Sequence, residues 1–211
     1  MYMARERVTI SVNSELLKKI DQQIDGTKIR NRSHAVESLI FEALGLDQIK
    51  DAIIMAGGNN VVKNINSIKD SLLRLKKLGI KEVIVAVGYL ADKIKKDLKN
   101  GQEFGLKLDY LEKGEGTGGS LFLLKKAIKK TFIVVNIDQR IDLDYKMLAD
   151  FHKLSGKIAT VATDNIKSFK GIYILEPKIF DYIPKEFSML EEDIFPVLLK
   201  ENELAVYPVI E

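Results

Sequence analysis

Four short apolar runs that alternate with helical patterns constrain the fold of this chain most. Runs of this kind are typical of strands that a parallel sheet buries on both faces, with helices packed above and below. The runs cover 52–56, 82–87, 132–136 and 158–162, and the helical patterns cover about 66–78, 91–99 and 119–129. The sequence therefore predicts an α/β domain with a mostly parallel sheet over residues 47–211.

Residues with functional potential follow three of these predicted strands. They are Gly57 and Gly58 after the first, Gly88 and Tyr89 after the second, and Asp138 after the third. Ligands of open α/β sheets bind beyond the carboxyl ends of the strands. We therefore expect a ligand pocket at this edge.

Six stretches, in chain order, resemble the sugar-1-phosphate nucleotidylyltransferases. They read DAIIMAGG, LKKLGIKEVIVAVGYLADKIKKDL, GEGTGGSL, FIVVNIDQRIDLD, GIYILEPKIFDYIP and EEDIFPVLLKENELAVYPV. The resemblance implies a Rossmann-like nucleotidyltransferase fold, a nucleoside-binding loop at GEGTGGSL and a metal-binding role for Asp138. The candidate ligand-binding residues are Gly57, Gly58, Gly116, Thr117, Gly118 and Asp138. The alternative for the glycines is that tight turns need their positive φ.

The phosphate-binding loop of that family is altered in this chain. The family reads Gly-x-Gly-Thr-Arg followed by Pro-Lys, whereas residues 59–64 read NNVVKN and supply only Lys63 as a cation. The family's lysine in a Glu-Lys-Pro segment has no counterpart between 163 and 171, and Asp138 lacks its usual partner carboxylate. These differences predict a pseudoenzyme with no catalytic, metal or cofactor site. An active enzyme that uses Lys63, Asp138 and Asp193 is the alternative.

A dinucleotide-binding fingerprint is a competing interpretation of the glycine-rich stretch. Gly114, Gly116 and Gly119 have the Gly-x-Gly-x-x-Gly spacing. The strand expected before them, 106–110, alternates polar and apolar residues, unlike the buried first strand of a Rossmann unit. The nucleotidylyltransferase resemblance is therefore favoured.

The N-terminal segment has a different pattern. Residues 5–12 alternate polar and apolar residues, which places Val8, Ile10 and Val12 on one strand face. A helix is expected from 14 to 24 after the signal Asn13-Ser14, and a second begins at a Ser33 cap and ends at Gly45. One strand without a partner is not stable alone, so two copies are expected to pair their strands.

This segment resembles a ribbon-helix-helix DNA-binding domain. The resemblance implies that Arg7, Thr9 and Ser11 contact bases in the major groove, while the segment before the second helix holds phosphates. The expected DNA-binding residues are Arg5, Arg7, Thr9, Ser11, Lys28, Arg30, Asn31, Arg32, Ser33 and His34. The predicted organisation is a ribbon-helix-helix domain (β-α-α, intertwined dimer) over 1–46, followed by a truncated nucleotidyltransferase-like domain over 47–211.

Together these patterns predict a homodimeric, sequence-specific transcription regulator that binds double-stranded DNA. Its inactive C-terminal domain is expected to sense a nucleotide or nucleotide-sugar ligand, or to mediate assembly. A DNA-organising, partition or antitoxin-like protein with a purely structural C-terminal domain is an alternative. The absence of cysteine and of an 18-residue apolar run predicts a cytoplasmic protein with no membrane partner. The net charge of +3 is compatible with nucleic acid but does not require it.

Overall fold

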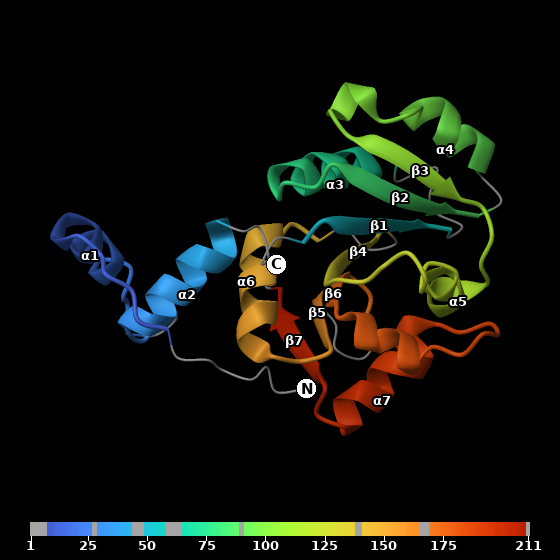
Figure 1. Ribbon diagram of the computed structural model, residues 1–211. Helices are drawn as coiled ribbons and strands as arrows, with labels where there is room; N and C mark the ends of the chain where they lie inside the picture. Colours follow the sequence, from blue (N-terminus) through green and yellow to red (C-terminus); the bar gives the residue numbers. More distant parts are fainter. Residues whose placement is uncertain are drawn as a thin grey trace. The chain divides into compact units, whose positions relative to one another are not determined.

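The computed structural model in Figure 1 contains two compact units, which are described separately below. They comprise Met1–Gln48 and Ile49–Glu211. The residues that the structure describes are 8–26, 29–43, 49–57, 65–88, 91–137, 141–164 and 169–209. The boundary expected between residues 46 and 47 falls outside them. In this described part of the chain, no helix is both long and apolar enough to cross a membrane.

The first unit contains two helices, α1 (Ser14–Asp21) and α2 (Arg32–Ala43). Asn13 caps α1 as expected, because its Oδ1 accepts the Leu16 N–H at 2.8 Å. The predicted Ser33 cap is wrong. Asn31 caps α2 instead: its longer amide side chain reaches the His34 N–H at 2.9 Å, so the helix begins two residues earlier than expected.

No strand is formed by residues 8–13 in the single chain; Val8 and Ile10 face solvent, and Val12 is partly buried. Val8 is 76% exposed and Ile10 is 56% exposed, and Leu16 on α1 is also exposed. The ribbon expected here needs a second copy as its partner, so it stays a prediction.

The second unit is built on a seven-stranded sheet with the order β3-β2-β1-β4-β6-β5-β7. The antiparallel strand β6 pairs with β4 and β5, and the remaining neighbours are parallel, which confirms a mostly parallel sheet. The strands are β1 (Asp51–Ala56), β2 (Glu82–Val87), β3 (Lys107–Leu111), β4 (Phe132–Asn136), β5 (Ala159–Thr163), β6 (Ile172–Leu175) and β7 (Leu204–Pro208).

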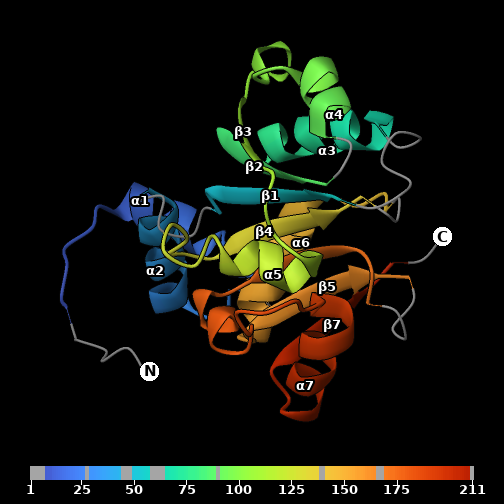
Figure 2. The same ribbon diagram turned by 90° about the vertical axis from the view of Figure 1, so that its right-hand side faces the viewer.

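Two hydrophobic cores cover the two faces of this sheet. Alternate residues of β1 belong to different cores: Ile54 packs with one, and Ile53 and Met55 pack with the other. The first core includes α3 (Ile65–Lys77), α4 (Ala91–Leu98) and α6 (Tyr145–Ser155). The second includes α5 (Gly116–Phe122), η2 (Pro177–Asp181), the π-helical turn η3 (Leu190–Ile194) and α7 (Phe195–Lys200). Burial on both faces explains why the strand sequences are continuously apolar. Figure 2 shows α5 and α7 away from α3 and α4.

Candidate functional site at the carboxyl ends of the strands

The carboxyl ends of β1, β2, β3 and β4 meet at one edge of the sheet because these strands are parallel. From β1 the chain builds outward through β2 to β3, and it then crosses to β4 on the other side of β1. The direction of growth therefore reverses between β1 and β4. Ligands of open α/β sheets bind in the crevice at such a switch point.

The turns after β1 and β2 are in close contact at this edge. A Cβ atom on Gly88 would lie only 2.8 Å from the Gly57 carbonyl oxygen. Glycine at position 88 therefore lets the two backbones approach each other. Gly58, Lys63 and Asp138, which the sequence places at the same edge, lie outside the described residues.

The glycine-rich segment after β3 packs against the chain around Ser188. A Cβ on Gly116 would lie 2.3 Å from the Ser188 carbonyl oxygen, and one on Gly118 would lie 2.3 Å from Ser188 Oγ. The Gly118 N–H also donates to the Ser188 carbonyl at 2.9 Å. Gly116 has a φ of 75°, whereas no positive φ is found at Gly118. Close packing, rather than turn geometry alone, therefore requires glycine at 118.

A buried carboxylate lies behind this segment. Glu191, on η3, is 4% exposed. Its Oε2 accepts the Thr117 hydroxyl at 2.6 Å, and its Oε1 accepts the Asn136 side-chain amide at 2.9 Å and the Tyr173 hydroxyl at 2.7 Å. One side chain thus connects α5, the end of β4 and β6.

Tyr173 remains a donor in this cluster. Burial raises the pKa of Tyr173 well above its usual value, and the adjacent Glu191 raises it further. The phenol therefore keeps its proton, donates it to Glu191 and accepts the Gly171 N–H at 3.2 Å.

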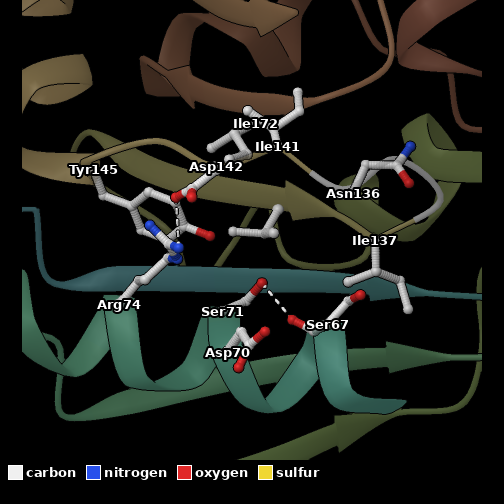
Figure 3. A pocket seen from close by; sticks show the side chains of 11 residues that line it. Ser67, Asp70, Ser71, Arg74, Asn136, Ile137, Ile141, Asp142, Tyr145 and Ile172 are labelled. Atoms are coloured by element: carbon white, nitrogen blue, oxygen red, sulfur yellow. Dashed lines mark hydrogen bonds and ion pairs between the residues drawn. The ribbon is translucent and has the colours of Figure 1, made fainter. Parts of the chain in front are cut away.

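A pocket lies beside the same edge on the α3 face (Figure 3). Arg74 Nη2 lies 2.7 Å from Asp142 Oδ1, and Arg74 Nη1 donates to the Leu143 carbonyl at 3.0 Å. Burial raises the pKa of Tyr145, which also lines the pocket. Arg74 of α3 therefore connects α3 to the segment before α6 through a salt bridge and a hydrogen bond.

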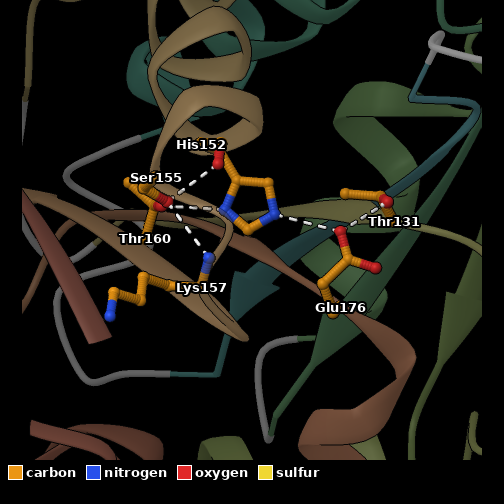
Figure 4. A network of polar contacts seen from close by, with 6 residues as sticks. All are labelled: Thr131, His152, Ser155, Lys157, Thr160 and Glu176. Atoms are coloured by element: carbon orange, nitrogen blue, oxygen red, sulfur yellow. Dashed lines mark hydrogen bonds and ion pairs between the residues drawn. The ribbon is translucent and has the colours of Figure 1, made fainter. Parts of the chain in front are cut away.

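A second polar cluster lies at the opposite edge, where β4 and β5 begin and β6 ends (Figure 4). His152 of α6 is 4% exposed; its Nδ1 lies 2.8 Å from Thr160 Oγ1 and its Nε2 lies 3.1 Å from Glu176 Oε1. Thr131 Oγ1 donates to the same Glu176 oxygen at 2.8 Å. This cluster joins α6 to three strands, away from the switch point.

Sequence reasoning missed Glu191. The active-enzyme alternative used the neighbouring Asp193, but Asp193 Oδ2 accepts the Met189 N–H at 2.7 Å, so Asp193 stabilises the start of η3. Among the described residues, no group of three His, Cys, Asp or Glu side chains is arranged to hold a metal ion. The sequence signal that could have indicated the burial of Glu191 is the apolar pattern Leu190-x-x-x-Ile194-Phe195. These three apolar residues are buried, and Glu191 is buried with them.

Of the residues predicted to bind DNA, some make contacts within the first unit, others are exposed, and three lie outside the described residues. Arg32 donates to both Asp21 carboxylate oxygens, at 2.8 and 2.7 Å, and this contact lowers the pKa of Asp21. Asn31 is the α2 cap, and His34 Nδ1 accepts the Arg30 N–H at 3.5 Å. Thr9, Ser11 and Ser33 are exposed, whereas Arg5, Arg7 and Lys28 lie outside the described residues.

Comparisons with known proteins point to nucleotidyl transfer. No protein-family profile matches the chain. It is 27% identical over 168 residues to a mannose-1-phosphate guanyltransferase of Debaryomyces hansenii, covering 62% of this chain and 46% of that protein. It is 29% identical over 164 residues to one of Saccharomyces cerevisiae, covering 60% and 45%. The chain thus spans about half the length of these curated relatives.

Solved structures show the same fold. HddC from Yersinia pseudotuberculosis matches with a TM-score of 0.61 and 21% identity, over 76% of this chain and 90% of that one. HddC complexed with GMP-PN matches with a TM-score of 0.60 and 20% identity, over 76% and 91%. The α/β unit therefore has the fold of HddC.

These comparisons correct the predicted function and partner. The prediction of a DNA-binding transcription regulator is wrong, because the matched proteins are guanylyltransferases and nothing in the comparisons supports DNA as a partner. The physical reason is that a polar–apolar alternation occurs in any half-buried strand. In addition, the Arg32 guanidinium is already paired within the unit.

The prediction of a non-enzyme is also contradicted. The named relatives are guanylyltransferases, and the related fold has been solved with a nucleotide analogue. The missing Thr-Arg and Pro-Lys pairs concern one short loop, whereas the sequence similarity extends over 164 to 168 residues.

Proposed function

We propose that residues 49–211 form a sugar-phosphate nucleotidyltransferase domain that binds its nucleotide at the switch point between β1 and β4. The observation that carries this proposal is the switch point of the sheet, where β1 and β2 each end at a glycine beside the carboxyl end of β4. Support comes from the guanylyltransferase relatives and from the GMP-PN complex of HddC. GTP and mannose 1-phosphate are therefore the first substrates to test.

The reaction is a displacement at phosphorus. A phosphate oxygen of the sugar phosphate attacks the α-phosphorus of the nucleoside triphosphate. The bond between the α-phosphorus and the bridging oxygen breaks, and pyrophosphate leaves with the electron pair of that bond. Such chemistry depends mainly on positioning and on neutralising phosphate charge.

We assign the nucleotide contacts to Gly57, Gly116, Thr117 and Gly118. Gly58 and Asp138, assigned from the sequence, belong to the same proposal. Lys63 is the cation that the sequence offers for the phosphates. This assignment leaves Asp193 as a structural residue, because its carboxylate caps η3.

Product formation by the full chain tests this proposal. The protein is incubated with GTP, mannose 1-phosphate and MgCl₂, and pyrophosphate and nucleotide sugar are measured. ATP, CTP, UTP and dTTP, and other hexose 1-phosphates, are tested in parallel. We expect both products in equal amounts and none without the sugar phosphate. The proposal is overturned if no combination yields products.

A pair of matched variants sharpens that assay. Asp138→Asn is expected to abolish turnover, because it neutralises the carboxylate assigned to the site. Asp150→Asn makes the same chemical change at an exposed position of α6, and we expect turnover to be retained. Equal turnover by the two variants contradicts the role of Asp138.

For the first unit, we propose a ribbon-helix-helix fold that is completed by a second copy. The exposed Val8 and Ile10 support this, because pairing of residues 8–12 between two copies buries both side chains. Light scattering on the full chain is expected to give a dimer, and Ile10→Lys a monomer. A monomeric wild type contradicts the proposal.

A further inference from the structure

The Glu191 carboxylate is held in an unusual environment for an acidic side chain. It is 4% exposed, and its three side-chain donors in the described part of the chain are neutral: Thr117, Asn136 and Tyr173. Taking a carboxylate out of water is costly even when it is hydrogen-bonded. An amide side chain would satisfy two of these three donors without burying a charge. The carboxylate therefore calls for an explanation beyond packing.

The Thr117 hydroxyl is fixed from both sides by this arrangement. It donates to Glu191 Oε2 at 2.6 Å and accepts the Leu190 N–H at 2.8 Å. The Thr117 hydroxyl proton points to Glu191, because a carboxylate oxygen can only accept a hydrogen bond, whereas the Leu190 N–H can only donate one. The Glu191 carboxylate thus sets the orientation of the Thr117 hydroxyl.

The same carboxylate joins two segments at the carboxyl edge of the sheet. Its Oε1 is bonded to Asn136, the last residue of β4, and its Oε2 to Thr117 in the segment after β3. The Gly118 N–H adds a second connection, to the Ser188 carbonyl at 2.9 Å. The glycine-rich segment is therefore fixed relative to β4 through Ser188 and Glu191.

We propose that Glu191 is a positioning residue that holds Thr117 and the glycine-rich segment 116–119 in the geometry that accepts the nucleotide. The inference rests on the proposed function. It goes further by assigning affinity for the nucleotide to a buried group that does not touch it. Fixing a binding segment in its bound geometry reduces the ordering cost of binding.

Glu191→Gln is the variant that breaks this arrangement with the smallest change in shape. The oxygen of the new amide accepts hydrogen bonds from Asn136 and Tyr173, so the amide NH₂ group faces Thr117. The Thr117 oxygen can then accept from both the new amide and the Leu190 N–H, but the Thr117 hydroxyl proton loses the carboxylate oxygen that accepts it. The variant therefore removes the group that orients the Thr117 hydroxyl, while the carbon skeleton at position 191 is unchanged.

Calorimetric titration of the full-length protein with GTP and MgCl₂ measures the effect. Relative to wild type, we expect Glu191→Gln to raise the Kd for GTP by about tenfold, the equivalent of one hydrogen bond to a charged group. KM for GTP is expected to rise by a similar factor, with a smaller change in kcat. The control is Glu176→Gln, an identical change at the opposite edge, which is expected to lower the melting temperature without changing the Kd.

Thr117→Val breaks the same contact from the other side, and it carries the test if Glu191→Gln does not fold. Thr117 could affect GTP binding by contacting GTP directly or only together with Glu191. The double variant distinguishes these two cases. If Glu191 acts through Thr117, the two losses do not add. Fully additive losses overturn the inference.

The remaining outcomes separate this inference from the proposed function. If wild type binds none of GTP, ATP, CTP and UTP, the proposed function fails and the inference fails with it. If wild type binds GTP and Glu191→Gln binds equally well, only the inference is overturned. An equal rise in Kd for Glu191→Gln and Glu176→Gln also overturns it, because the effect is then one of general stability.

Discussion

Two polar clusters at opposite edges of the same sheet use similar groups for different purposes. At the carboxyl edge, Glu191 is buried and bonds the glycine-rich segment after β3 to the end of β4. At the other edge, Glu176 is only half-buried and bonds His152 of α6 to the start of β4 through Thr131. One cluster therefore holds the glycine-rich segment at the carboxyl edge of the sheet, whereas the other joins α6 to the sheet.

The glycines beside the two clusters also differ in how closely other residues pack against them. Beside Glu191, Gly116 and Gly118 lie so close to Ser188 that a Cβ atom would collide at either position. Beside His152, a Cβ on Gly156 would meet nothing within 4 Å, although the φ of 62° at Gly156 disfavours an L side chain. Substitution of Gly116 or Gly118 should therefore meet a steric collision, whereas substitution of Gly156 should meet backbone strain alone.

The largest expected effect is the loss of the Glu191 side chain. Glu191→Ala leaves Asn136, Tyr173 and Thr117 without their shared acceptor, and we expect a stability loss of about 3 kcal/mol. Glu176→Ala is expected to cost about 1 kcal/mol, since water can replace part of its contacts. Urea denaturation measures both. Equal losses contradict the difference in burial that underlies the comparison.

Alanine substitution of two neighbouring glycines in α5 tests the close packing. Gly118→Ala drives a methyl group into Ser188 Oγ and should cost about 2 kcal/mol. Gly119→Ala meets only the Glu186 carbonyl at 3.6 Å, an ordinary contact, and should be neutral or stabilising by about 0.5 kcal/mol. The reverse order in urea denaturation would show that Ser188 does not restrict position 118.

The opposite edge should respond to acid. Burial alone raises the pKa of Glu176, but hydrogen bonds from His152 and Thr131 outweigh burial and hold its pKa below the usual value of 4.5. The folded state therefore binds its proton less readily than the unfolded state. The stabilisation is complete above the usual pKa and is lost as the pH falls through the lowered one.

Melting temperatures of wild type and Glu176→Gln measure this dependence. We expect wild type to be the more stable at pH 7 and the difference to shrink below the usual pKa. A constant difference between pH 7 and pH 3 would show that the Glu176 charge contributes nothing.

Removing one donor from the same cluster should have the smallest effect. Thr131→Val keeps the shape of the side chain but deletes its hydrogen bond to Glu176, and it should cost about 0.5 kcal/mol. Because Thr131 lies at the edge opposite the proposed nucleotide site, the Kd of the Thr131→Val variant for GTP should equal that of wild type. A weakened Kd would indicate that the two edges are coupled.

The sequence predicted the sheet well because its strands are buried on both faces. The expected runs at 82–87 and 132–136 coincide with β2 and β4. The antiparallel direction of β6 was not predicted, because the apolar residues of a strand do not encode its direction. The helix expected at 119–129 instead spans Gly116–Phe122, because the packing on Ser188 fixes where α5 begins.

The candidate site was less accessible to sequence reasoning. The glycines at positions 57, 116 and 118 were selected from the sequence, and their role in binding remains a prediction. Glu191 was missed because an acidic residue beside two other acids indicates an exposed segment, and only the fold shows its burial. The altered phosphate loop was given too much weight against the similarity of the rest of the domain.

Amide hydrogen exchange of the full chain with and without GTP and MgCl₂ tests most directly whether the two edges differ in function. We predict slower exchange on binding in peptides that cover residues 52–57, 84–88 and 112–122 at the carboxyl edge. Peptides that cover 150–160 and 174–178 at the other edge should be unchanged. Protection confined to the His152 edge, or no protection anywhere, would contradict a nucleotide site at the switch point.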